Sequence, residues 1–192
     1  MDSERTVGEV VNLIVELGLV DQDAPMLQTL LTADLEEPLS EYGHTDQSAV
    51  LGLFQEIGIL YTLDYKTFRG IGECTDEQRR EGYESELQSI AACSRGMVTI
   101  TNVRLVEDDG KWELEFKCNG TYEYWPVYPG SDEEDLEAGL VFASYVHHLP
   151  TGTVEKFCSV DPGVLDVGGA AVFGDPKALN RLGAHFGLTF ST

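Results

Sequence analysis

The middle of the chain carries an alternation of apolar and polar residues that predicts β-strands. β-branched residues are frequent in 97–106, and apolar residues occupy alternate positions in 112–116, a period typical of a strand with one buried face. A third run of this kind covers 121–125. An acidic turn at 107–110 and Asn-Gly at 119–120 separate the three runs. Because Asn-Gly tolerates the positive φ angles of a tight hairpin, we expect three antiparallel strands.

The second of these strands divides its side chains between two faces of the expected sheet. An antiparallel sheet commonly packs one face on the core and leaves the other in water. We expect the apolar residues to make the buried face and the charged residues the wet one. The two sets are Trp112, Leu114 and Phe116 on the buried face and Glu113, Glu115 and Lys117 on the wet face.

Elsewhere apolar residues recur every three or four positions, which predicts amphipathic helices. Capping residues and glycines mark the ends of these segments. The expected helices lie between Thr6 and Gly18, Asp23 and Leu35, Thr45 and Gly58, Thr75 and Gly96, Ser131 and Pro150, and Asp175 and Gly187. The three helices of the first third bury little surface by themselves, so they need a partner surface.

Three further runs at 59–65, 153–160 and 170–173 have the β-branched and aromatic composition of strands. With the hairpins, they predict an α+β fold: an antiparallel sheet of about five to six strands packed by helices, with a helical N-terminal portion. No low-complexity linker interrupts the chain, so we expect a single domain over 1–192. The alternative is a mainly helical N-terminal subdomain at 1–72 followed by an α+β domain at 73–192.

The net charge bears on function more than the rest of the composition does. The chain has 34 acidic and 12 basic side chains, which give a net charge of −22. Such a surface repels nucleic acid and anionic lipid and attracts basic proteins. The alternative interpretation is that the acidity only keeps the protein in solution. We therefore expect no nucleic-acid or membrane partner, and a basic protein partner if the charge serves binding.

The sequence contains few candidate residues for catalysis, metal binding or phosphate binding. His147 and His148 are adjacent on an expected helix and point about 100° apart, so they are poorly placed to chelate one ion. The four cysteines form no Cys-x-x-Cys pair, and neither Gly70-Ile71-Gly72 nor Gly168-Gly169 completes a phosphate-binding motif. We expect no metal, no cofactor and no enzymatic activity. The acidic N-terminus and the lack of a long apolar run predict a cytoplasmic protein with reduced thiols.

One resemblance gives a more specific expectation. The segment 110–122, the acidic helix and two strands that follow it, and the last helix opened by 173–179 resemble small acidic bacterial immunity proteins of polymorphic-toxin systems. The resemblance covers residues 97–190. It implies a cytosolic inhibitor that binds its cognate toxin and blocks the toxin's site. Our leading hypothesis is a basic toxin domain, for example a nuclease domain.

We therefore expect a partner-binding surface that combines an acidic helix start with aromatic anchors. Packing beneath the helix that follows is the alternative role for the aromatic residues. Two other functions stay open: an adaptor or chaperone that binds through the N-terminal amphipathic helices, and an enzyme whose site is assembled from scattered residues. The expected binding residues are Asp132, Glu133, Glu134, Asp135, Glu137, Tyr124, Trp125 and Tyr128.

Overall fold

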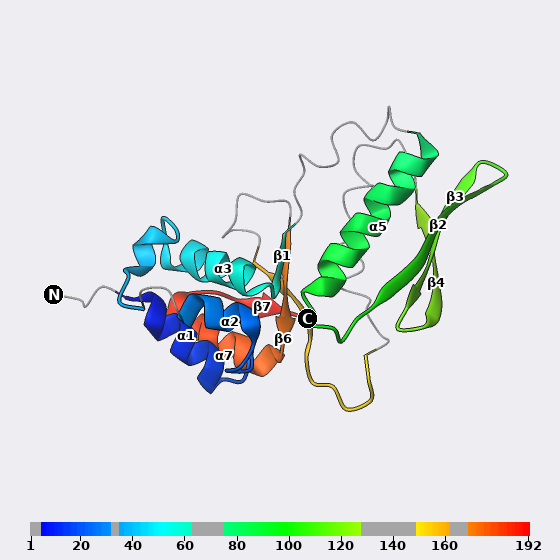
Figure 1. The fold of residues 1–192 in the computed structure, drawn as a ribbon. Helices are drawn as coiled ribbons and strands as arrows, with labels where there is room; N and C mark the ends of the chain where they lie inside the picture. The colour runs from blue at the N-terminus through cyan, green and yellow to red at the C-terminus, as the bar shows by residue number, and fades with distance from the viewer. Residues whose placement is uncertain (1–4, 32–34, 63–74, 128–148, 162–168) are drawn as a thin grey trace.

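The computed structural model describes residues 5–31, 35–62, 75–127, 149–161 and 169–192. It has the predicted α+β class, with helices and two antiparallel sheets. In Figure 1 the N-terminal helices and α7 lie at one end of the molecule, and α5 lies beside a twisted three-stranded sheet at the other. The described helices are α1 (Val7–Glu16), α2 (Pro25–Leu31), a 3₁₀ turn η1 (Leu39–Glu41), α3 (Asp46–Ile57), α5 (Asp76–Ala92) and α7 (Pro176–Phe186).

The helices begin at the predicted capping residues. The hydroxyl of Thr45 accepts the backbone N–H of Ser48, and the hydroxyl of Thr75 accepts that of Gln78, each within a reciprocal capping box. Asp175 accepts the N–H of Lys177 ahead of Pro176, which suits the first helical position. These local patterns are confirmed, whereas the helix expected between Ser131 and Pro150 lies almost entirely outside the described residues.

A four-stranded antiparallel sheet occupies the middle of the molecule. Its strand order is β1-β6-β5-β7, so its outer strands come from distant parts of the chain. All five residues of β6 are buried, because both faces of the sheet are covered. The strands are β1 (Leu60–Thr62), β5 (Lys156–Val160), β6 (Ala170–Gly174) and β7 (Phe190–Ser191).

Two hydrophobic clusters meet at this sheet. The first, here called the helical core, contains Ala170 and Val172 of β6 together with the apolar faces of α1, α3 and α7. The second, the α5 core, contains Ala171 and Phe173 together with α5 and the three-stranded sheet. Successive residues of a strand point to opposite faces, so one strand supplies both cores. The partner surface that the N-terminal helices need is therefore this sheet and α7.

The three-stranded sheet confirms the predicted hairpins. It contains β2 (Ile100–Asp108), β3 (Lys111–Cys118) and β4 (Thr121–Val127), in that order. The pairs Asp109-Gly110 and Asn119-Gly120 both have positive φ angles, as a two-residue hairpin turn requires. The expected division of β3 is also found, because Leu114 and Phe116 are fully buried while Glu113 is exposed.

The strands form two sheets where the sequence predicted one. Pairing within β2-β3-β4 is dictated by tight turns, which are local signals. Pairing of β1 with β6 joins residues more than 100 positions apart, and periodicity does not specify such a choice. The strand β7 and the turn η1 were not predicted because each is only two or three residues long. The alternative domain boundary between residues 72 and 73 lies outside the described residues.

Candidate protein-interaction surface

Figure 1 shows α5 along one side of the three-stranded sheet. The other side of the sheet carries the exposed aromatic residues Tyr122 and Tyr124. Residues directly opposite one another on antiparallel strands point to the same face. The register therefore places three cross-strand rows on this side, and we call the surface they make the outer sheet face. The rows are Thr101, Lys117 and Tyr122; Arg104, Glu115 and Tyr124; and Val106, Glu113 and Pro126.

Two tyrosines of β4 dominate the outer sheet face. Tyr122 is 56% exposed and Tyr124 is 53% exposed. Their rings stack with centroids 6.1 Å apart and planes inclined by 22°. The ammonium of Lys117 lies 4.6 Å from the centroid of the Tyr122 ring, a distance typical of a cation–π contact. The pair therefore forms a flat aromatic area that is held in place and open to solvent.

Trp125 points to the opposite side of the same strand. Its ring meets Phe116 edge to face, with centroids 5.1 Å apart and planes at 83°, and it packs against the α5 core. Of the two predicted anchors within the described residues, only Tyr124 is thus exposed, whereas Trp125 packs against the α5 core. Packing beneath the helix that follows, the alternative role, stays untested because that helix lies outside the described residues. Tyr122 was not among the predicted anchors, although its spacing of two from Tyr124 indicates the same face.

The remaining predicted binding residues cannot be placed. They are Tyr128, Asp132, Glu133, Glu134, Asp135 and Glu137, all of which lie outside the described residues. They follow β4 in the sequence, and their role in binding stays a prediction.

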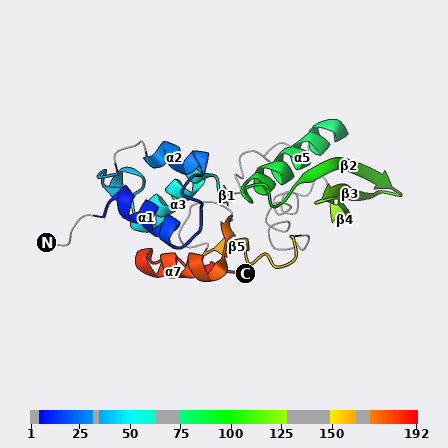
Figure 2. The same cartoon turned by 60° about the horizontal axis from the view of Figure 1, so that its bottom comes forward.

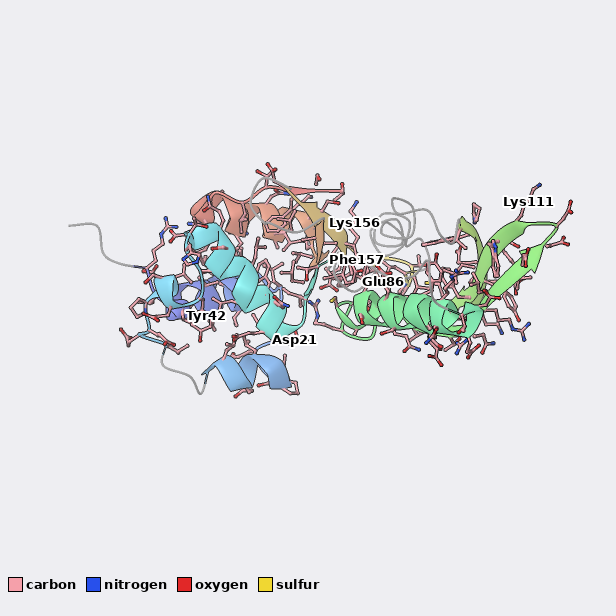
Figure 3. All side chains as sticks on the ribbon, turned by 90° about the horizontal axis from the view of Figure 1, so that it is seen from above. Asp21, Tyr42, Glu86, Lys111, Lys156 and Phe157 are labelled. Atoms are coloured by element: carbon pink, nitrogen blue, oxygen red, sulfur yellow. The ribbon has the colours of Figure 1, made fainter. Side chains whose placement is uncertain are left out.

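Charges on the outer sheet face are close to balance. Arg104 lies opposite Glu115, and Lys111 lies opposite Asp108 at the end of the first hairpin. Figure 3 shows Lys111 at the outer tip of this sheet. Opposite charges across strands favour the sheet modestly. The exposed tyrosines therefore lie on a surface of mixed charge within a strongly acidic protein.

Residues 1–62, which include the N-terminal helices, carry half of the net negative charge. Residues 1–62 contain twelve acidic side chains and one basic side chain, Arg5. That basic side chain is engaged, since its guanidinium bonds Asp46 at 2.8 Å and lies over the ring of Phe186. Most of the acidic side chains in this part that the structure describes are exposed: Glu9, Glu16, Asp21, Asp23, Glu36, Glu41, Asp46 and Glu56.

The thiols that the structure describes are poor candidates for nucleophilic catalysis. Cys93, Cys118 and Cys158 are buried and free, and burial is the main cause that raises the pKa of each to about 11. A thiol with such a pKa holds almost no nucleophilic thiolate at neutral pH. Cys74 lies outside the described residues. The burial of Cys118 and Cys158 agrees with a packing role.

One buried polar contact joins the two sheets through α5. The hydroxyl of Tyr61 in β1 donates to Oε1 of Glu86 at 2.6 Å. Burial, with the adjacent carboxylate of Glu86, raises the pKa of Tyr61. The contact ties the edge of the four-stranded sheet to the helix that backs the three-stranded sheet. Both side chains are nearly inaccessible, so we assign the pair a structural role.

Within the described residues, no group of three or more His, Cys, Asp or Glu side chains is placed to hold a metal ion. His44 and His185 are exposed, and His147 and His148 are among the residues that the structure leaves undescribed. No helix in the described ranges is both long enough and apolar enough to cross a membrane.

Comparisons with protein-family models, with curated protein sequences and with solved structures found no match to this chain. The functional interpretation accordingly depends on the geometry of the outer sheet face and on the distribution of charge.

Proposed function

We propose that this protein is a non-catalytic inhibitor that binds a basic protein in the cytosol, with the outer sheet face as its anchor surface. A toxin domain neutralised by an immunity protein is the specific case that we favour. The observation that carries the proposal is the stacked, half-exposed pair Tyr122 and Tyr124 on a backed sheet. Tyrosine is enriched at the centres of interfaces, where a few aromatic residues supply most of the binding energy.

The outer sheet face is suited to binding because its residues lose little conformational freedom when a partner binds. Two tight hairpins fix the register of its strands, and α5 covers the reverse side through Leu87 and Ile90. Tyrosine has only two side-chain torsions and offers a large contact area at a low entropic cost. Stacking of the two rings restricts those torsions further, which favours affinity through preorganisation.

The net charge adds long-range attraction for a basic partner. A field of this sign raises the association rate of a cationic protein and falls steeply with ionic strength. Because the N-terminal helices are strongly acidic and the charges of the outer sheet face are balanced, we assign charge and aromatic contact separate roles in binding. The acidic surface steers the encounter, and the tyrosines slow dissociation.

The adaptor alternative has less support from the packing. Val7, Val10 and Ile14 of α1 and Phe54 of α3 are all 0% exposed and belong to the helical core. The apolar faces of these helices are therefore already occupied by the chain itself. Deleting residues 1–58 would uncover the four-stranded sheet, so loss of binding in that variant would not identify a contact surface.

The test is affinity capture from the native host with matched tyrosine and tryptophan variants. Wild-type protein is expected to recover a basic protein, and Tyr122→Ala with Tyr124→Ala is expected to weaken that complex at least about 30-fold, the effect of removing a hot spot. Trp125→Phe is the control, since this neighbour on the opposite face contacts Phe116. It is expected to leave affinity unchanged.

The dependence of the binding rates on salt concentration distinguishes the role of the acidic surface from that of the tyrosines. The association rate is expected to fall as ionic strength rises, because screening shortens the reach of the acidic field, while the dissociation rate responds mainly to the tyrosines. Unchanged affinity in the double tyrosine variant would refute the anchor surface. Recovery of only acidic or neutral partners would refute the basic partner.

A further inference from the structure

A hollow of about 900 Å³ lies where the two halves of the molecule meet. One wall is the end of α1 and the connection to α2, at 17–25. The other is the segment 151–155 ahead of β5, with residues that follow α5. In Figure 2 the segment ahead of β5 crosses between the N-terminal helices and the α5 half. The hollow is thus assembled from four separate parts of the sequence.

The basic side chain in the wall of the hollow is already engaged. The guanidinium of Arg95 forms an ion pair with Glu155, which also lines the hollow. It also lies over the ring of Phe173, with its central carbon 5.7 Å from the ring centroid. These contacts compensate the charge of Arg95 and of Glu155 together, so the pair contributes little net charge to the hollow.

The remaining charges in the wall are negative. Asp21, Asp23 and Asp175 line the hollow in addition to Glu155. Figure 3 shows Asp21 on the side of the N-terminal helices nearest to α5. The helix α1 also ends here at its cap residue Leu17, with no basic residue in its last turn. The carbonyl end of a helix carries partial negative charge, and the partial positive charge at the start of α7 is met by its cap residue Asp175. The wall therefore has a net negative charge, which favours a cation.

Thr151 and Thr153 add hydroxyl groups to the wall, and another part of it is apolar. Leu19, Val20 and Met97 contribute to it, and Val154 at its border is 67% exposed. An apolar wall combined with carboxylates matches a side chain that has an aliphatic stem and a cationic head. Lysine and arginine have this construction and bury their stems while keeping the head with polar groups.

We propose that the hollow holds an arginine or lysine side chain from a basic segment of the protein partner. The inference rests on the proposed function for the identity of the partner, and it adds a second contact that selects cationic residues. The carboxylates of Asp21 and Asp23 meet the head group, and Leu19, Met97 and Val154 cover its stem. Charge complementarity between the wall and a basic segment is the observation that selects this occupant.

The test uses the isolated protein and a small probe. N-acetylarginine amide is titrated into isotopically labelled protein, and amide NMR shifts are followed. We expect saturable shifts confined to 17–25, 95–97 and 151–155. N-acetylcitrulline amide has nearly the same shape without the charge, so it is expected to produce at least fivefold weaker binding. Equal binding of the two probes would overturn the proposal.

Two double variants that remove the same charge test whether the arginine probe binds in the hollow. Asp21→Asn with Asp23→Asn is expected to weaken the arginine probe at least fivefold. Glu41→Gln with Glu56→Gln removes the same charge from exposed positions that do not line the hollow and is expected to leave binding within twofold of wild type. Equal weakening by both variants would mean that general electrostatics, and no defined site, attracts the probe.

The result of the probe titration can be distinguished from the result of the capture experiment that tests the proposed function. Specific binding of the arginine probe without capture of a basic protein would refute the inhibitor proposal and keep the cationic site. Capture of a basic protein through the tyrosines, with no specific binding of the probe, would refute the site and keep the inhibitor. Thermal unfolding of each variant, matched to wild type, confirms that the fold is retained.

Discussion

The two sheets of this protein use strands in opposite ways. In the four-stranded sheet β6 is buried along its whole length, with Ala171 and Phe173 in one core and Val172 in the other. In the three-stranded sheet β4 packs the partly buried Trp125 against the α5 core and exposes Tyr122 and Tyr124. A continuous apolar run indicates a strand that holds the molecule together, whereas alternation indicates one that can offer a surface.

The largest expected effect comes from truncating matched aromatic residues in the two sheets. Phe173 is 0% exposed and meets Phe157 with ring centroids 4.9 Å apart, so Phe173→Ala is expected to cost about 3–5 kcal/mol of unfolding free energy. Tyr124→Ala removes an exposed ring and is expected to cost less than about 1 kcal/mol. Urea unfolding measures both, and similar losses would show that the outer sheet face is not a free surface.

Intermediate effects of opposite sign are expected from two glycines in the α5 half. Gly120 has a φ of 82° in the second hairpin, so Gly120→Ala is expected to destabilise by about 1–2 kcal/mol through backbone strain. Gly82 lies inside α5, and a Cβ there meets nothing within 4 Å. Gly82→Ala is therefore expected to stabilise by about 0.5–1 kcal/mol, since alanine favours helix. Chemical denaturation with equal slopes checks both, and a neutral Gly120→Ala would contradict the hairpin geometry.

The smallest expected effect is a dependence of the unfolding free energy on pH, and it allows the two cores to be compared. Cys118 belongs to the α5 core and Cys158 to the helical core, and burial raises the pKa of both to about 11, against an ordinary value near 8.5. Between these values the unfolded thiol loses its proton first, so unfolding free energy falls as pH rises from about 9 to 11. Cys118→Ala and Cys158→Ala are each expected to reduce that slope.

Reaction of the same thiols with a disulfide reagent reports how each core opens. Both are expected to react slowly in the folded state, because reaction requires an opening that exposes them. Equal protection of Cys118 and Cys158 would indicate that the cores open together. Rapid reaction of either thiol at neutral pH would contradict its burial.

The parts of the fold that local chemistry determines were predicted from the sequence. Thr45, Thr75 and Asp175 cap helices as expected, and Asn119-Gly120 forms the expected turn. Each signal involves residues a few positions apart, so spacing alone reveals it. The pairing of β1 with β6 and the division into two sheets depend on contacts between distant segments, which have no signature in the periodicity.

The outer sheet face and the hollow differ in how far the sequence predicts them. Alternation in β4 already assigns Tyr122 and Tyr124 to one face and Trp125 to the other, so this distinction was present in the sequence. The hollow was not, because Asp21, Arg95, Val154 and Asp175 come from four segments. No spacing rule brings such residues together before the fold is known.

The double role of β6 also constrains how the chain can change in length. Adding or removing one residue within this strand would reverse every side chain that follows it. Phe173 would then turn toward the N-terminal helices, and Val172 would turn toward α5. Insertions are therefore tolerable in the connections of this protein but not in β6, where a shift of one position would misalign both halves of the molecule.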